Sequence, residues 1–286
     1  MATVIFDGIA YGMLLFLISV GLSITLGLMN FVNLAHGVFA MVGGYAALLA
    51  MNSWGLGFLL ALGVAFVVAA VVGGVLEVLL FRHVYRGSPL DQVLLSIGVV
   101  FVATALASWL FGPSVQLFTL PTWLQGQYSF LGLALGRYRS FLVLSGLVVM
   151  VLLVLGVSRT AYGARVRAAV DNVRAAQGLG INVQRLFFLT FSLGAGLAGV
   201  GGALSLELLG MEPAFALKYM IYFLMVVAVG GAGTLLGPLM AALLIGVVDM
   251  AGKYYLPATG AFLVYIVMVL VLLLRPNGLL TPKGKS

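Results

Sequence analysis

Long apolar runs repeat along the whole chain, and they constrain its fold more than any other feature. About 20 apolar residues are enough for a helix to cross a bilayer. Only 7% of the 286 residues are charged, against about 25% in soluble domains, so the chain cannot cover a water-facing surface. The sequence predicts an all-α, polytopic transmembrane helical bundle of eight or nine spans, some of them interrupted. The apolar runs are 8–29, 38–51, 56–81, 92–111, 140–157, 186–209, 219–232, 235–250 and 260–274.

The basic residues predict how this bundle is oriented. They cluster at Arg82 and Arg86, in the polar stretch 158–185, and near the C-terminus. We expect residues 1–286 to form a single transmembrane domain. Because Lys and Arg accumulate on the cytoplasmic side, we expect its C-terminus to be cytoplasmic. In this topology 158–185 is a cytoplasmic loop and 112–139 is an extracytoplasmic connection. We expect a bacterial or archaeal cell (inner) membrane, and we read the first apolar run as a membrane helix.

The remaining composition narrows the function. The basic residues lie between hydrophobic runs, so the net charge of +7 indicates topology and not a nucleic-acid partner. The chain contains no Cys, which excludes disulfides and thiolate chemistry, and its two His argue against a histidine metal site. We therefore expect no catalytic, cofactor-binding or metal-binding residues in this chain.

The polar stretch 158–185 is the most informative part of the sequence. Residues 164–177 are rich in Ala and Arg and lack Gly and Pro, which predicts a short helix. Arg167, Asp171 and Arg174 would share one face, with Asp171 able to pair with both arginines. Gly178 and Gly180 would end the helix. Two interpretations stay open on these residues alone: a basic anchor on lipid headgroups, or a helix that docks on a cytoplasmic partner.

Motifs along the chain resemble those of LivH-type branched-chain amino acid ABC transporter permeases. Arg-Ala-Ala-Gln-Gly-Leu-Gly-Ile-Asn-Val (174–183) resembles the coupling loop of that family. The order and coverage of these motifs together make the resemblance specific, although Asn277 stands where Gln is the more familiar residue. The other matching blocks are 21–45, with Asn33-Leu34-Ala35-His36-Gly37, then 77–98, 230–238 and 275–279.

This resemblance implies a permease subunit of an ABC importer for branched-chain or related small amino acids, working by alternating access. The implied partners are two ATP-binding subunits, a second related permease subunit, an extracytoplasmic substrate-binding protein and membrane lipid. The chain has no Gly-x-x-x-x-Gly-Lys-Ser/Thr loop, so ATP would act only through partner subunits and the chain would not be an enzyme. Some relatives carry urea or short amides. The residues implied for ATPase coupling are Arg167, Asp171, Arg174, Ala175, Ala176, Gly178 and Gly180.

Two interruptions of the apolar runs are candidates for the translocation pathway. Discontinuous helices near the bilayer midplane are a common way to build a transport site. The residues at the interruptions could equally be capping turns and packing positions, and a lone His beside a turn is often a hydrogen-bonded packing residue. Both interpretations stay open for Asn30, Asn33, His36, Gly37, Gly230, Gly231 and Gly233.

Three carboxylates in or near apolar runs support an alternative, an ion-coupled secondary transporter with Glu77, Glu207 and Asp249 as a relay. Against this, Glu77 lies five residues from Arg82, and Asp249 lies four residues from Lys253, so both could form structural pairs at the interface. A membrane-embedded enzyme would need a cluster of His, Asp or Cys, which we do not find. A scaffolding protein would not require two helix interruptions.

Overall fold

Nine apolar helices form the body of the molecule in the part of the chain that the structure describes. The structure is a computed structural model that describes residues 1–280 except 30, 32, 86, 131–132 and 232. The predicted all-α bundle is confirmed, and its long and short apolar helices together are compatible with eight or nine spans. Six helices are long and apolar enough to cross a membrane: α1 (Ala2–Met29), α3 (Phe58–Leu76), α5 (Pro89–Phe111), α6 (Arg137–Arg159), α9 (Val183–Leu209) and α11 (Leu236–Tyr255). Three are shorter: α2 (His36–Asn52), α10 (Phe215–Gly230) and α12 (Gly260–Leu274).

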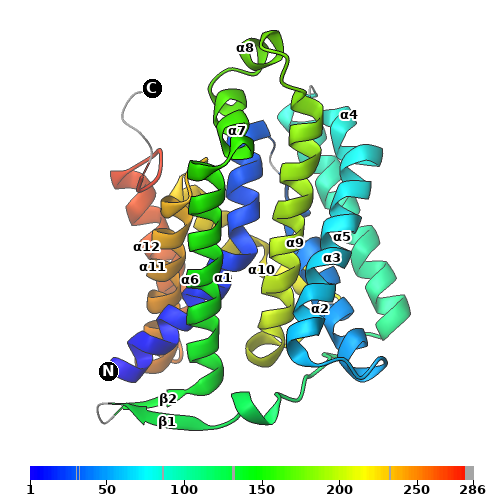
Figure 1. Ribbon diagram of the computed structural model, residues 1–286. Coiled ribbons are helices and arrows are strands. Elements are labelled where there is room, and N and C mark those ends of the chain that lie inside the picture. Colours follow the sequence, from blue (N-terminus) through cyan, green and yellow to red (C-terminus); the bar gives the residue numbers. More distant parts are fainter. Residues whose placement is uncertain (30, 32, 86, 131–132, 232, 281–286) are drawn as a thin grey trace.

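Among the six long helices, α1 is the most deeply buried, and it packs against α6, α9, α10 and α11 (Figure 1). Glycine permits the closest of these approaches. Gly21 lies directly against Gly194 of α9, and Gly12 lies against Gly246 of α11, where no side chain would fit. Small residues let helix backbones touch in lipid, where no hydrophobic force between helices drives association. The abundance of glycine in the sequence therefore serves the packing of the central helices.

In contrast, α5 and α6 expose large apolar side chains on most of their surface. Phe101, Val102 and Leu106 of α5 are exposed, as are Val151 and Leu152 of α6. Exposed apolar patches of this extent are rare on soluble monomers. They fit helices that face lipid or another membrane protein.

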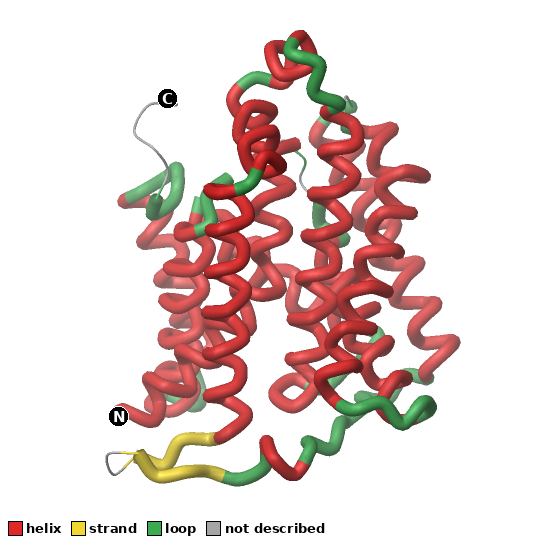
Figure 2. The backbone as a smooth tube through the Cα atoms, in the orientation of Figure 1, coloured by secondary structure: helices red, strands yellow, loops and turns green. Residues whose placement is uncertain are grey.

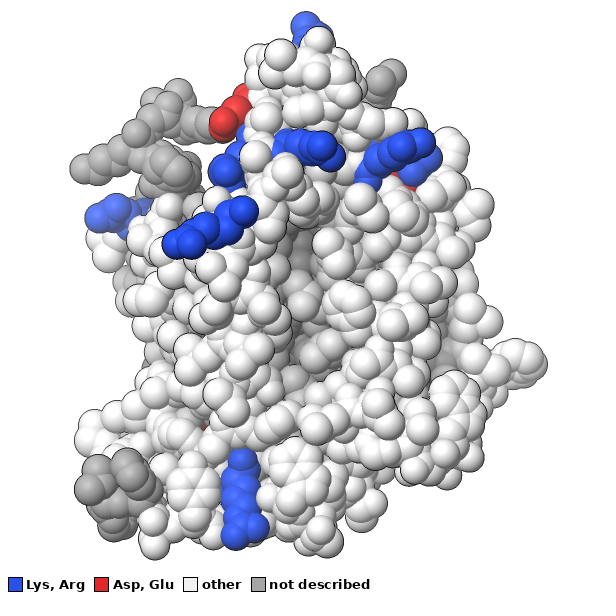
Figure 3. Space-filling view, viewed as in Figure 1, with Lys and Arg blue, Asp and Glu red and all other residues white. Residues whose placement is uncertain are grey.

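The two ends of the bundle differ in charge (Figure 3). We call the end that carries α7 (Ala161–Asp171) and α8 (Val173–Gly178) the arginine end, since Arg159, Arg165, Arg167, Arg174 and Arg185 lie there. We call the opposite end, where the N-terminus lies, the hairpin end because it carries strands β1 (Gln127–Phe130) and β2 (Leu133–Gly136) (Figure 2). The chain alternates between the two ends from α1 to α12.

The connection from α5 to α6 crosses the hairpin end. It contains a short 3-10 turn, η2 (Thr122–Leu124), followed by the antiparallel pair β1 and β2, in which Gln127 lies opposite Gly136. A backbone bridge between Gln116 and Met211 ties it to the chain that follows α9. The sequence did not predict this hairpin, and α6 begins at Arg137 where the connection was expected to extend to residue 139.

Candidate functional site: the arginine end and two helix breaks

Two short helices, α7 and α8, form the protrusion of the arginine end, where one helix over 164–177 was predicted. That prediction was wrong because the backbone at Asn172 is extended, with φ −157° and ψ 103°. The Asn172 side chain accepts a hydrogen bond of 3.0 Å from the Ala175 amide and so begins a new helix. Asparagine competes with helix hydrogen bonds in this way and favours caps over helix interiors. Thr160 caps α7 through the Gly163 amide at 3.1 Å.

The predicted pairing of Asp171 with Arg167 and Arg174 was also wrong. Among the described residues the structure contains four ion pairs, and none of them includes Asp171. The helix ends at Asp171, so Arg174 no longer lies on the same helical face. The Arg167 guanidinium instead donates to the Val157 carbonyl near the end of α6.

Most of the predicted coupling residues lie together on the exposed surface of this protrusion. Ala176 is buried and holds α8 in place, whereas the other predicted residues are exposed. Sequence reasoning missed Leu179, whose side chain is 79% exposed between two of the predicted glycines. An apolar residue flanked by Gly178 and Gly180 in a polar loop was the signal that could have found it. The exposed predicted residues are Arg167, Asp171, Arg174, Ala175, Gly178 and Gly180.

Rigid contacts join α7 to the long helices on either side of it. Val166 and Ala169 are buried, and Gly163 lies against the Val157 backbone with no room for a side chain. The Tyr162 hydroxyl lies 2.7 Å from Thr190 Oγ1 of α9. Because Thr190 donates its own proton to the Leu186 carbonyl, Tyr162 is the donor. Burial raises the pKa of Tyr162 above its ordinary value, so the donor keeps its proton at neutral pH.

A cavity of about 840 Å³ lies between the protrusion and the ends of α1, α4 (Arg82–Val84) and α9. Its volume falls within the range of small-molecule sites, about 300–1,000 Å³. Its wall mixes apolar side chains with a few polar ones. Among the lining residues are Met29, Arg82, Tyr85, Val170, Gln177 and Phe187.

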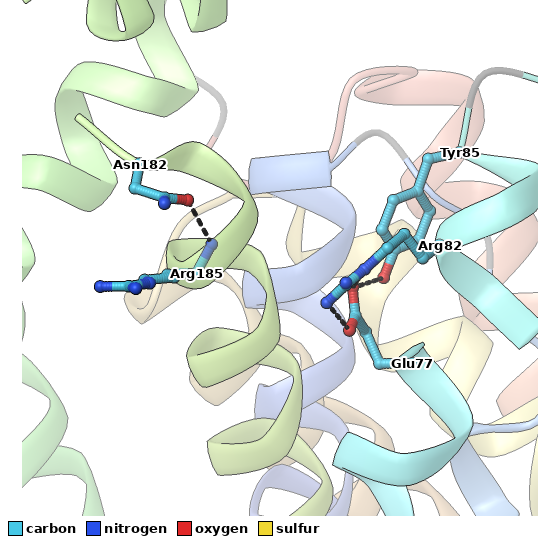
Figure 4. A network of polar contacts seen from close by, with 5 residues as sticks. All are labelled: Glu77, Arg82, Tyr85, Asn182 and Arg185. Atoms are coloured by element: carbon cyan, nitrogen blue, oxygen red, sulfur yellow. Dashed lines mark hydrogen bonds and ion pairs between the residues drawn. The ribbon is translucent and has the colours of Figure 1, made fainter. Parts of the chain in front are cut away.

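A buried ion pair stands beside this cavity (Figure 4). Glu77 is fully buried at the start of a π-helical turn, η1 (Glu77–Phe81), that continues α3. Arg82 donates to the two carboxylate oxygens of Glu77 at 2.8 and 3.3 Å, and the Tyr85 hydroxyl adds a third hydrogen bond at 3.3 Å. The expected Glu77–Arg82 pair is confirmed. In the same view Asn182 caps α9 through the Arg185 amide, while the Arg185 side chain points away from the pair.

The first helix break separates α1 from α2. Asn33 is buried, and its Oδ1 accepts a hydrogen bond of 3.0 Å from the Ala35 amide. Its Nδ2 is buried and has no hydrogen-bond partner among the described residues. His36 Nε2 lies 2.8 Å from the Ile18 carbonyl in the middle of α1, so α2 begins deep inside the bundle. Gly37 packs against Ala216 of α10. Asn30, the fourth candidate here, lies outside the described residues.

The second break separates α10 from α11 and rests on the end of α1. The Gly233 amide donates to the Ser23 carbonyl at 3.2 Å, and the Ser23 hydroxyl donates to the Thr234 carbonyl at 3.3 Å. Gly231 and Gly233 have positive φ, 91° and 79°, a backbone conformation that favours glycine. Gly230 packs against Gly237 across the turn. Both breaks therefore contact α1, although the sequence places them in opposite halves of the chain.

The three carboxylates of the secondary-transporter alternative do not come together. Glu77 lies near the arginine end, whereas Glu207 is an exposed residue two positions before the end of α9 at the hairpin end. Asp249 is buried in α11, where it accepts hydrogen bonds from Lys253 at 2.6 Å and from Tyr222 at 3.3 Å. The expected Asp249–Lys253 pair is thus confirmed. Among the described residues, no group of three His, Asp or Glu side chains is placed to hold a metal ion.

Comparison with known proteins gives consistent matches over nearly the whole chain. The family described as branched-chain amino acid transport system / permease component matches residues 4–272. The chain is 30% identical to the probable branched-chain amino acid transport permease protein LivH of Methanocaldococcus jannaschii, over 95% of this chain and 90% of that protein. It is 27% identical to the high-affinity branched-chain amino acid transport system permease protein BraD of Pseudomonas aeruginosa, over 96% and 94% of the two chains.

A third permease protein, with another name, also matches. The chain is 26% identical to the high-affinity branched-chain amino acid transport system permease protein LivM of Escherichia coli, over 94% of this chain and 68% of that protein. The match therefore extends across three differently named permease proteins of branched-chain amino acid transport.

Proposed function

Because the chain belongs to the family of branched-chain amino acid transport permeases, we propose that it is the membrane-spanning permease subunit of an ABC importer for branched-chain or related small amino acids. The family places the chain in a membrane as a transport component and not as an enzyme. The match over residues 4–272 is the single observation that carries the proposal. Its finer parts, the partners, the docking surface and the pathway, rest on the following features.

The orientation follows from the charge of the two ends. The arginine end concentrates the basic residues of the polar stretch 158–185, and cytoplasmic loops carry the excess of Lys and Arg. We place this end in the cytoplasm of a bacterial or archaeal cell, across its inner membrane. Since α12 ends at the arginine end, the C-terminus is then cytoplasmic, and the connection at the hairpin end is extracytoplasmic.

The protrusion of the arginine end is the docking surface for an ATP-hydrolysing partner in this proposal. An exposed apolar anchor inside a polar rim is the usual anatomy of a protein interface. Leu179 would be that anchor, and Arg167, Asp171, Arg174, Ala175, Gly178 and Gly180 would surround it, with Ala176 holding the helix from below. Since the chain carries no phosphate-binding loop, ATP would be hydrolysed by partner subunits. The proposal includes two of them.

The contacts of α7 suggest how a push on this surface reaches the membrane helices. Tyr162 links α7 to α9, and Arg167 links α7 to α6. A displacement of the protrusion would therefore tilt α6 and α9 as rigid bodies, and α9 lies directly on α1. Alternating access needs two states that the partner contacts differently. We propose that the protrusion is the element through which the partner biases these states.

The two breaks are the proposed pathway elements. Burying an amide donor without an acceptor costs about 1–3 kcal/mol. Since the Nδ2 of Asn33 has no acceptor within the described part of the chain, a substrate or a second conformation could supply one there. Gly37, Gly230, Gly231 and Gly233 would allow the breaks to change shape. His36 is bonded to α1, which favours an anchoring role for it at the pathway wall.

This part of the proposal is tested by Asn33→Leu, which we expect to reduce uptake several-fold while the complex still assembles. The change also removes the acceptor of the Ala35 amide, so assembly must be measured alongside by size-exclusion chromatography. Uptake at the wild-type rate would leave Asn33 with a capping role only.

The remaining partners follow from the family. LivH and LivM are both named as permease proteins of branched-chain amino acid transport. We propose that this chain pairs with a second, related permease and receives substrate from an extracytoplasmic binding protein. Two permeases and two ATPases would complete the membrane assembly.

Co-purification in mild detergent tests the proposal as a whole. The chain is expressed with its neighbouring genes, and the bound proteins are identified by mass spectrometry. We expect an ATP-binding subunit to be recovered with the wild-type chain and lost with Leu179→Glu. A chain that purifies alone, yet transports amino acids in vesicles, would contradict the proposal.

A further inference from the structure

The connection between α5 and α6 has an unusual composition for a segment outside the helices. Residues 112–136 contain no Asp, Glu, Lys or Arg, whereas roughly a quarter of the residues of a soluble domain are charged. The segment is also rich in aromatic and aliphatic side chains. A loop standing in water would not have this composition, so the surroundings of the connection need another explanation.

Large side chains of the connection and its neighbours are exposed at this one end. Leu117 is 79% exposed, and Trp123 and Tyr128 are also exposed. The other two tryptophans of the chain, Trp54 and Trp109, are exposed where α2 meets α3 and where α5 ends, both at the hairpin end. Tryptophan and tyrosine gather at membrane–water interfaces because their rings are apolar and their tips are polar. No tryptophan lies at the arginine end.

The connection is held flat against the bundle on its inner side. Leu124 is buried, and the Trp123 ring packs edge-on against Phe58 of α3 and Phe141 of α6, with centroids 6.4 and 5.7 Å apart. Figure 1 shows β1 and β2 crossing the end of the bundle and not extending away from it. One side of the segment is therefore packed, and its other side presents apolar surface.

Some of its polar groups are paired, either within the segment or with the adjoining chain. The strands pair with each other, and the backbone of Gln116 pairs with that of Met211 at 2.7 and 3.1 Å. The side-chain amides of Gln116 and Gln125 donate to the carbonyls of Phe111 and Leu120. These hydrogen bonds lower the cost of bringing the hairpin and its neighbours into the interface, where unpaired backbone groups become costly as water thins out.

The exposed surface is continuous with the apolar faces of two helices. Trp109 and Leu110 precede the connection at the end of α5, and Leu144 lies one turn beyond Phe141 on α6. Docking sites for soluble proteins usually carry a polar and charged rim, whereas residues 112–136 contain no charged residue. This continuity and the missing charges favour lipid as the occupant.

We propose that the described parts of this connection, 112–130 and 133–136, form an interfacial membrane element. It lies at the boundary between headgroups and acyl chains at the hairpin end and holds the ends of α5 and α6 at that depth. The partner is the lipid surface itself. This inference rests on the membrane location of the chain and is independent of which substrate it carries.

Spin labels on single cysteines test the proposal in the full chain, because the sequence has no native Cys. Leu117→Cys and Leu179→Cys start from leucines of equal exposure, 79% each, at opposite ends. Leu152→Cys, on the exposed face of α6, provides the lipid reference. In phosphatidylcholine vesicles, collisions with oxygen report apolar surroundings, and collisions with a water-soluble nickel chelate report water.

At position 117 we expect an oxygen-to-nickel collision ratio several-fold above that at 179 and close to that at 152. A ratio equal to that at 179 would place the connection in water and overturn the proposal. A label that neither reagent reaches would show that protein covers the segment, and would overturn it too.

Fluorescence gives a readout that needs no label. In a chain carrying Trp54→Phe and Trp109→Phe, only Trp123 remains. We expect lipids brominated near the headgroup to quench its emission strongly and aqueous iodide to quench it weakly. Strong quenching by iodide, with no effect of the brominated lipids, would contradict the proposal.

Discussion

The two longest connections of the bundle, 112–136 at the hairpin end and 160–182 at the arginine end, each join two long helices but differ in charge and in backbone. The first has no charged residue, whereas the second carries Arg165, Arg167, Asp171 and Arg174. The first is a flat turn and hairpin, and the second is a pair of capped helices that project from the bundle. Yet each exposes one leucine to the same extent, Leu117 and Leu179.

The comparison teaches that exposure alone does not identify a partner. Leu179 lies among arginines and helix-capping residues, on a surface that water can reach. An exposed leucine in such surroundings is suited to anchor a soluble protein. An equally exposed leucine in a charge-free segment, next to lipid-facing helices, fits the bilayer. The four predictions below test this contrast, from the largest expected effect to the smallest.

The largest effect is expected from Arg174→Glu or Gly178→Asp in the protrusion. Within the described residues, no neighbouring atom lies within 4 Å of a Cβ placed on Gly178, so the new side chain does not disturb their packing. A carboxylate on the docking surface should weaken the binding of the ATPase by about 2 kcal/mol or more, as changes at interface hot spots do. Pull-down and uptake measured on the same preparations would report the loss.

The matched control for that change is Ser114→Asp in the opposite connection. It adds the same charge at an exposed position of the hairpin end. ATPase binding should stay at the wild-type level in this variant. Equal weakening by both changes would mean that the effect is not specific to the protrusion.

The next prediction compares the loss of stability when either buried carboxylate, Glu77 or Asp249, is neutralised. Removing one partner of a fully buried ion pair costs about 3–5 kcal/mol. Arg82 is 30% exposed, so Glu77→Gln should cost well below that range while still lowering the thermal unfolding midpoint. Asp249→Asn should lower it less, because Lys253 is 53% exposed against 30% for Arg82 and can extend to water. Midpoints in detergent would give the order, and the reverse order would contradict the assignment.

A smaller effect is expected from Tyr162→Phe, which removes the hydrogen bond that links α7 to α9. A single such bond contributes about 1 kcal/mol, so the chain should stay folded and bind its ATPase. Uptake per ATP hydrolysed should fall, because the displacement of α7 by the partner is transmitted less rigidly to α9. Tyr128→Phe is the control, since it removes a bond of 2.6 Å to Ser140 at the hairpin end. If uptake per ATP hydrolysed is unchanged in Tyr162→Phe, this residue does not transmit the displacement of α7 to α9.

The smallest effect is expected from salt. Raising the ionic strength from about 0.1 M to about 1 M shortens the screening length from about 10 Å to about 3 Å. ATPase binding at the arginine end should weaken a few-fold, whereas the lipid contact of residue 117 should not change. Titrations of ATPase affinity and of the spin-label ratio at both salt levels would check this. A salt-sensitive ratio at 117 would indicate a charged partner at the hairpin end.

The sequence predicted the parts of the fold that depend on local hydrophobicity. The run 260–274 coincides with α12, and most other runs match helices to within a few residues because a bilayer imposes length and apolarity on each span. The pairs Glu77–Arg82 and Asp249–Lys253 could also be predicted, since both lie within one or two turns of a helix.

Other features could not be predicted because they depend on contacts between distant segments or on local competition. The helix breaks at Asn172 because its side-chain oxygen accepts the hydrogen bond of the Ala175 amide, in place of a backbone carbonyl. His36 bonds to Ile18 only because α2 enters the bundle beside the middle of α1. The hairpin at 127–136 forms from a charge-free segment whose pattern did not show strand alternation clearly.

Uptake of radiolabelled leucine into vesicles tests the central claim most directly. The vesicles contain this chain with its second permease and ATPase, ATP inside, and the binding protein outside. The account predicts uptake that requires ATP and is lost with Arg174→Glu although the chain remains inserted. Uptake by this chain alone, driven by an ion gradient and unaffected by Arg174→Glu, would contradict it.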